Sequence, residues 1–142
     1  MAVMDVKMLE RFMREQFPQM DHMGMRIEAA GGRSARIHLP VDNRHLRPGG
    51  TISGPTMMAL SDCAMYLAIL AELGPVALAV TSNLNISFLR KPPAGDIVAE
   101  ARILKLGRRL ATGTVEIHSV GDPDAVAFAT LTYAIPAAGA AA

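Results

Sequence analysis

The segment from Met57 to Ala71 constrains the fold most, because fifteen consecutive residues carry a single charge, that of Asp62. A helix that is apolar on every side is typical of a helix buried in a protein core. At about 1.5 Å per residue it would span roughly 22 Å, which is too short to cross a bilayer comfortably. Burying a carboxylate without a partner is costly, so Asp62 is expected either to be held by hydrogen bonds or to work in a pocket.

The start of this helix is predicted at Ser53-Gly54-Pro55. Serine is a frequent N-cap, because its hydroxyl accepts a hydrogen bond from a backbone N–H of the first turn. Proline suits that turn, because its missing N–H would have had no partner there. Gly74-Pro75 is the predicted end of the helix.

The composition points to a single domain with buried interfaces. The chain has 142 residues, of which 51% are hydrophobic and 19% charged, and this favours an oligomer. The net charge of +1 gives no reason to expect nucleic acid or a membrane as a partner. Cys63 is the single cysteine, which excludes an internal disulfide and suits a cytoplasmic location. We expect one domain over residues 1–136, a flexible Ala-rich tail over 137–142 and no signal peptide.

The remaining chain alternates between a helical period and a period of two. Apolar residues at helical spacing predict an amphipathic helix over Asp5–Phe17. In the predicted strand Ala77–Arg90, Thr81 and Asn83 are expected on one polar face. Because helices and strands are segregated, the predicted class is α+β, with a curved antiparallel sheet wrapped around one central helix. The other predicted strands are Met25–Ala29, Ala35–Leu39, Ile97–Leu106, Leu110–Val120 and Ala125–Ile135.

Two segments carry a resemblance to a known family. The first matches the family loop N-x-x-G-T-x-H-G-G and a later Asp, and consists of Arg47, Gly50-Thr51, Ser53-Gly54-Pro55 and Asp62. The second runs from Asn85 to Pro92 and is followed by Gly95-Asp96. With these residues the chain, from Ile37 to Tyr133, resembles the hotdog-fold thioesterases of the PaaI-like group, which hydrolyse acyl-CoA. It departs from the family where Arg47, Ser53 and Pro55 replace an Asn, a His and a Gly.

The resemblance implies a catalytic site between two subunits. Asp62 would activate water or attack the thioester itself, and the Gly54 N–H would stabilise the oxyanion at a helix N-terminus. Thr81 falls near the family's hydroxyl position and would hold the attacking water. The alternatives are a structural carboxylate at Asp62, an ordinary helix-start glycine at Gly54 and an ordinary strand residue at Thr81.

Further residues are candidates for binding the substrate. CoA carries phosphates, which Arg and Lys bind well, although basic residues at hairpin ends are often simply solvated. Ser53 would contact the substrate or only cap the helix, and Met58 would line an acyl pocket or the core. The histidines lack metal-ligand spacing, so neither a metal nor a cofactor beyond the CoA of the substrate is expected. The full set of predicted substrate-binding residues is Arg47, Ser53, Pro55, Met58, Asn83, Arg90, Lys91, Arg108 and Arg109.

The predicted function is hydrolysis of aryl- or medium-chain acyl-CoA by a homodimer or a dimer-of-dimers homotetramer. One alternative is a non-catalytic hotdog protein that binds acyl-CoA or an aromatic ligand, which the loss of the family's His at Ser53 motivates. Another is an enoyl-CoA hydratase on the same fold. That activity needs a His in the site, and the central helix carries none.

Overall fold

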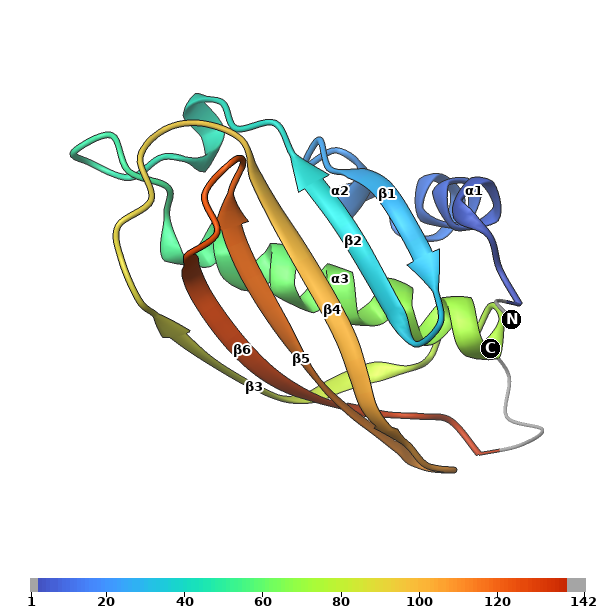
Figure 1. Cartoon of the computed structure of the whole chain (residues 1–142). Coiled ribbons are helices and arrows are strands. Elements are labelled where there is room, and N and C mark those ends of the chain that lie inside the picture. The colour runs from blue at the N-terminus through green and yellow to red at the C-terminus, as the bar shows by residue number, and fades with distance from the viewer. Residues whose placement is uncertain (1–2, 138–142) are drawn as a thin grey trace.

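One antiparallel sheet of six strands curves around a single long helix in the computed structural model, which describes residues 3–137 (Figure 1). The strands lie in the order β1-β2-β4-β5-β6-β3, so the strand that follows the long helix occupies one edge of the sheet. This is the α+β hotdog architecture that the sequence predicted. The flexible tail predicted at 137–142 lies, from residue 138 on, outside the described residues. The elements are α1 (Val6–Gln16), α2 (Pro18–Asp21), β1 (Arg26–Gly31), β2 (Ser34–Leu39), a 3-10 turn (Asn43–His45), α3 (Gly54–Leu73), β3 (Val80–Phe88), β4 (Ile97–Leu106), β5 (Leu110–Ser119) and β6 (Ala125–Ala134).

The central helix α3 begins at the predicted cap. The hydroxyl of Ser53 accepts a hydrogen bond from the Thr56 N–H at 3.2 Å, and the chain leaves the helix at Gly74, whose φ is 92°. α3 has 20 residues between the predicted start and the predicted end, against fifteen in the apolar run Met57–Ala71, and could span a bilayer by length and composition. The prediction that it is too short is therefore wrong. Its position is decided by packing, since 72% of its most apolar stretch is buried inside the fold.

The N-terminal helix α1 packs beside α3 and β1, away from the main part of the sheet (Figure 1). Asp5 caps it by accepting a hydrogen bond from the Met8 N–H at 2.9 Å. Leu9 and Met13 are buried, while the charged residues of α1 face solvent, which confirms the amphipathic prediction. The short helix α2 follows directly and carries the chain to the start of β1.

Strand β3 contains an irregularity that decides which residues face the helix. Thr81 lies opposite Tyr133 on β6, whereas Asn83 lies opposite Thr132, so the extra residue Ser82 forms a bulge. Paired residues share a face, and therefore Thr81 points inward with Tyr133 while Asn83 points to the outer face. The prediction that Thr81 and Asn83 share one face is wrong, because a bulge breaks the period of two.

The free edge of β3 is the other feature that matters for the site. Within residues 3–137, β3 pairs with β6 on one side and with no strand on the other. Val80, Phe88 and Leu89 are about half exposed along this edge, at 55%, 48% and 57%. An unpaired edge with apolar side chains is a ready surface for pairing with another strand.

Candidate functional site

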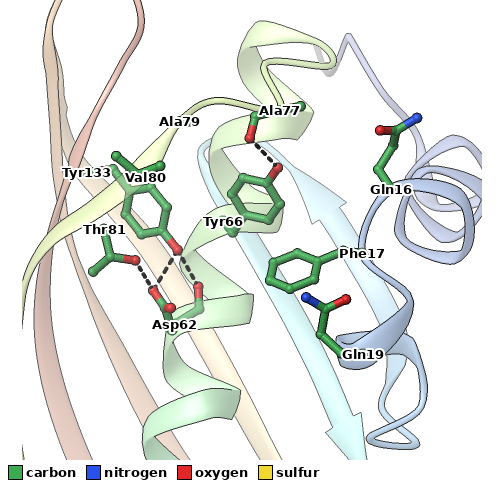
Figure 2. Close-up of a pocket in the computed structure, with 10 residues that line it drawn as sticks. All are labelled: Gln16, Phe17, Gln19, Asp62, Tyr66, Ala77, Ala79, Val80, Thr81 and Tyr133. Atoms are coloured by element: carbon green, nitrogen blue, oxygen red, sulfur yellow. Dashed lines mark hydrogen bonds between the residues drawn. The ribbon is translucent and has the colours of Figure 1, made fainter.

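The Asp62 carboxylate accepts two hydrogen bonds on one of its oxygens (Figure 2). Thr81 Oγ1 donates to Oδ1 at 2.5 Å, and the Tyr133 hydroxyl lies 2.6 Å from the same atom and 2.9 Å from the main-chain oxygen of Asp62. No described residue donates to Oδ2. The Asp62 side chain is partly exposed. The carboxylate is thus both held by hydrogen bonds and open on one side.

A cleft of about 310 Å³ lies in front of this carboxylate. α3 forms its floor, the start of β3 and the end of β6 form one wall, and the junction of α1 and α2 forms the other (Figure 2). Its volume is at the lower end of the range for small-molecule pockets. The lining residues are Gln16, Phe17, Gln19, Asp62, Tyr66, Ala77, Ala79, Val80, Thr81 and Tyr133.

Aromatic rings form the inner wall of the Asp62 cleft. Tyr66 stacks on Tyr133 with ring centroids 6.1 Å apart, and Phe17 meets Tyr66 edge-on at 6.0 Å. The Tyr66 hydroxyl donates to the Ala77 carbonyl at 3.1 Å. Burial and the charge of Asp62 raise the pKa of Tyr133, so its hydroxyl stays protonated and available as a donor.

Sequence reasoning missed Tyr133, Tyr66 and Phe17. In the sequence, Tyr133 is an ordinary residue of the last predicted strand, and its contact with Asp62 depends on the register between β6 and β3. Phe17 ends the predicted amphipathic helix, where its spacing places it on the apolar face. The one available signal was that these are three of the six aromatic residues in the chain, since Tyr occurs twice and Phe four times.

A second, smaller cleft lies at the N-terminus of α3. It has a volume of about 170 Å³ and contains Gly54 and Phe88. A Cβ on Gly54 would lie 3.3 Å from Cζ of the Phe88 ring, so glycine permits this close approach. In the described part of the chain, no group accepts a hydrogen bond from the Gly54 N–H. This leaves an unpaired donor at the positive end of a helix. The other lining residues are Arg47, Thr51, Ile52, Met57, Arg90, Lys91 and Pro92.

The two clefts are separated along α3. Gly54 and Asp62 are eight residues apart on one helix, which corresponds to about 12 Å at about 1.5 Å per residue. A carbonyl group cannot contact both across that distance. One chain therefore presents a carboxylate half-site and a separate amide half-site.

The predicted basic residues divide between the two ends of the sheet. Arg47, Arg90 and Lys91 line the Gly54 cleft, and Arg90 also lies 3.4 Å from Asp124 and 3.7 Å from Asp122. Arg108 and Arg109 sit in the turn between β4 and β5. That turn lies at the Thr81 end of the sheet, because Leu110 pairs with Ala134, which in turn pairs with Val80.

Three other predicted residues are placed as follows. Pro55 occupies the first turn of α3 beside Gly54 and contributes no donor. Met58 is 42% exposed and lines neither cleft. Asn83 points to the outer face of the sheet and is not brought to the Asp62 cleft.

Cys63 lies beside Asp62 but belongs to the core. It is 3% exposed, and its Sγ lies 3.2 Å from Met25 Sδ. Burial raises the pKa of the Cys63 thiol, so it is a poor nucleophile. The residues that the structure describes contain no group of three or more His, Cys, Asp or Glu side chains arranged to hold a metal ion.

Comparison with known proteins agrees with this architecture. The model of the thioesterase superfamily matches residues 49–126. A proposed thioesterase from Silicibacter sp. TM1040 is 44% identical and superposes with a TM-score of 0.88, with coverage of 96% of this chain and 94% of that one. A mutant of the phenylacetic acid degradation protein PaaI from Thermus thermophilus is 32% identical, with a TM-score of 0.75 and coverage of 84% and 99%. Thioesterase PA1618 from Pseudomonas aeruginosa is 32% identical over 85% of this chain and 84% of its own length.

These likenesses confirm the resemblance to PaaI-like proteins and the hotdog fold. They also confirm the predicted class of enzyme, a thioester hydrolase. The family match covers the end of the loop before α3, the whole of α3 and the strands β3, β4 and β5. The chain belongs to the thioesterase superfamily.

Proposed function

We propose that this protein hydrolyses acyl-CoA thioesters at a site shared by two copies of the chain. The observation that carries the proposal is the Asp62 carboxylate, held on Oδ1 by Thr81 and Tyr133 and open to a cleft on its other oxygen. A general base or nucleophile needs this combination of fixed orientation and access. The alternative reading of Asp62 as a purely structural carboxylate does not account for the cleft.

The second copy would supply the oxyanion donor. A twofold axis across the free edge of β3 would pair two β3 strands antiparallel, so the start of one would lie beside the end of the other. Thr81 lies near the start of β3 and Phe88, which touches Gly54, at its end. The Asp62 cleft of one copy would therefore meet the Gly54 cleft of its partner. This arrangement would close the gap of about 12 Å that α3 imposes within one chain.

The chemistry would proceed through attack on the thioester carbon. Either Asp62 takes a proton from water, whose oxygen then bonds to the carbon, or Oδ2 attacks and the resulting anhydride is cleaved by water. In both routes the carbonyl oxygen becomes negative and is stabilised by the Gly54 N–H at the helix N-terminus. The carbon–sulfur bond then breaks, the thiolate of CoA takes up a proton, and the products are a free acid and CoA.

The aromatic wall supports an aryl- or medium-chain acyl group. Tyr66 and Phe17 present ring surfaces within the Asp62 cleft, where an acyl group would extend from the reacting carbon. The likeness to a phenylacetic acid degradation protein favours the aryl group. Basic residues at both strand ends would contact the CoA phosphates across the paired edges. These residues are Arg47, Arg90, Lys91, Arg108 and Arg109.

A thiol-release assay over a panel of acyl-CoA esters tests this function. Wild type should release CoA from aryl- and medium-chain esters, and Asp62→Asn should lower kcat by about a thousandfold or more while keeping the fold. Undiminished hydrolysis by Asp62→Asn would contradict the proposal. The same assay on cytoplasmic extract fractions would test the proposed cytoplasmic location.

A binding protein without hydrolysis is the second candidate, because Ser53 stands where the family has His. Its hydroxyl is occupied by the helix cap, 2.8 Å from Thr56 Oγ1 and 3.2 Å from the Thr56 N–H. Calorimetry that detects tight acyl-CoA binding without release of thiol would favour this candidate.

The histidine nearest to Gly54 does not support hydratase chemistry. His45 is 4% exposed, its Nδ1 accepts from the Asp42 N–H at 3.0 Å and its Nε2 lies 3.1 Å from the Met23 carbonyl. Both ring nitrogens are thus occupied by the backbone, so the ring has a structural role beneath the loop that precedes α3.

A further inference from the structure

Tyr133 holds the Asp62 carboxylate from the sheet, although it belongs to neither of the segments that carry the family resemblance. Its side chain is 3% exposed and its hydroxyl reaches both Oδ1 and the main-chain oxygen of Asp62, at 2.6 and 2.9 Å. Through this one hydroxyl, β6 contacts both the side chain and the main chain of Asp62 on α3 (Figure 2).

The two hydroxyl contacts use one carboxylate oxygen completely. A carboxylate oxygen has about two lone-pair directions, and Oδ1 accepts from both Thr81 and Tyr133. No described residue reaches Oδ2. The two donors thus distinguish the oxygens, and Oδ2 is the atom left to face the cleft.

The hydrogen bond from the Tyr133 hydroxyl to Asp62 is held in place by packing. The ring is stacked on Tyr66 and cannot swing away without disturbing the core. Burial and the neighbouring carboxylate raise the pKa of Tyr133, so its proton remains in place across the pH range in which enzymes work.

We propose that Tyr133 is a positioning residue, which fixes Oδ1 of Asp62 so that Oδ2 meets the thioester carbon or the attacking water. This inference rests on the proposed function for its kinetic consequence. Tyr133 acts through Asp62 and does not itself exchange a proton with the substrate. Its role differs from that of Thr81, whose oxygen is also free to accept a hydrogen bond from water.

The test is Tyr133→Phe, which removes one oxygen atom and keeps the ring. Loss of a hydrogen bond to a charged group should lower kcat by about tenfold, with little change in KM. The loss should fall on kcat because a carboxylate no longer held on Oδ1 loses its orientation toward the reacting carbon. A merely structural tyrosine would lower the free energy of unfolding without this split between kcat and KM.

Tyr66→Phe is the matched control. It makes the same chemical change on the neighbouring ring, whose hydroxyl donates to Ala77 and not to Asp62. It should leave kcat within about threefold of wild type, whatever its effect on KM.

Fluorinated tyrosine gives a second test, which keeps the hydroxyl of Tyr133 in place. The chain has two tyrosines, so growth on 3,5-difluorotyrosine in a Tyr66→Phe background labels Tyr133 alone. Fluorination perturbs the ring but keeps the hydroxyl donor, so kcat should stay near that of the Tyr66→Phe background. A retained kcat in the fluorinated protein beside a lowered kcat in Tyr133→Phe would exclude a general loss of structure as the cause.

A carbon-13 NMR measurement at fixed pH separates this inference from the proposed function. The Asp62 carboxyl signal, assigned by its loss in Asp62→Asn, should have a different chemical shift at fixed pH in Tyr133→Phe than in wild type, and an unchanged one in Tyr66→Phe. This result would support the positioning role even if no acyl-CoA were hydrolysed, which would sink only the proposed function. Chemical shifts that coincide in Tyr133→Phe and wild type would overturn the role of Tyr133, even in an active enzyme.

Discussion

Gly54 and Asp62 lie on the same helix but open into different clefts, about 12 Å apart at the usual helical rise. An amide donor and a carboxylate that act on one carbonyl must lie much closer to each other than that. Because both residues lie within the one helix α3, the helical rise fixes their separation and it cannot be closed within one chain. It therefore predicts that a complete site needs two chains.

Complementation between two inactive variants tests the shared site. Asp62→Asn removes the carboxylate, and Gly54→Val fills the close approach beside Phe88, so each homodimer should be nearly inactive. A mixed dimer would contain one doubly damaged site and one intact site. With random assembly, co-expression should restore about a quarter of wild-type kcat per chain.

The measurement is thiol release by the whole co-expressed mixture, purified through one tag that both variants carry. Co-expression of wild type with Asp62→Asn is the control and should retain about half of the activity under the same statistics. Activity of the mixture no higher than that of the separate variants would show that the two groups do not meet across an interface.

Phe17→Ala tests the acyl pocket. Removing the ring opens the wall of the Asp62 cleft, and KM for an aryl-CoA should rise by about tenfold, with kcat changed by less than about threefold. Phe12→Ala is the matched control, because Phe12 also packs against Tyr66, at 6.3 Å, but does not line the cleft. It should lose similar stability and keep KM. Equal KM values for the two variants would remove Phe17 from the binding surface.

Gly113→Ala tests the packing of α3 on the sheet. A Cβ at this position of β5 would meet the Arg102 carbonyl oxygen and, at 2.5 Å, Cε of Met65 on α3. The added methyl should lower the free energy of unfolding by roughly 2–3 kcal/mol, measured by urea denaturation. Thr114→Ala, on the outer face of the same strand, should change it by less than about 0.5 kcal/mol. Full stability in Gly113→Ala would mean that the helix can shift at little cost.

His38→Gln tests a charge cluster on the outer face of the sheet. His38 lies 2.7 Å from Asp96 and 3.1 Å from Glu28, and the hydrogen bond to Asp96, with a smaller contribution from Glu28, raises the pKa of His38. The stabilisation is therefore fully present below the pKa of the unfolded histidine, near 6.5, and is lost as the pH rises through the higher folded value.

His38→Gln should accordingly lose about 0.5 kcal/mol of stability at pH 5.5 and almost none at pH 9. Urea melts at the two pH values measure this difference, and added salt should reduce it. An equal loss at both values would assign the effect to packing rather than to charge.

The elements of the fold could be read from local patterns. The cap at Ser53, the apolar run that becomes α3 and the alternation in β4 and β5 are each encoded by neighbours in the chain. The single charge within that run marked Asp62 as the candidate catalytic residue. These predictions succeeded because burial of a helix and pairing of a strand depend on periodicity that a single segment contains.

The composition of the site could not be read in the same way. Tyr133 meets Asp62 through the register of β6 against β3, and the bulge at Ser82 separates the faces of Thr81 and Asn83. Phe17 reaches the cleft because α1 packs beside α3. The sequence by itself determined a buried helix with one carboxylate and with a glycine amide at its start, eight residues away and so apart from it. Only the tertiary structure decided which side chains surround them, because register, bulges and helix packing depend on contacts between residues distant in the chain.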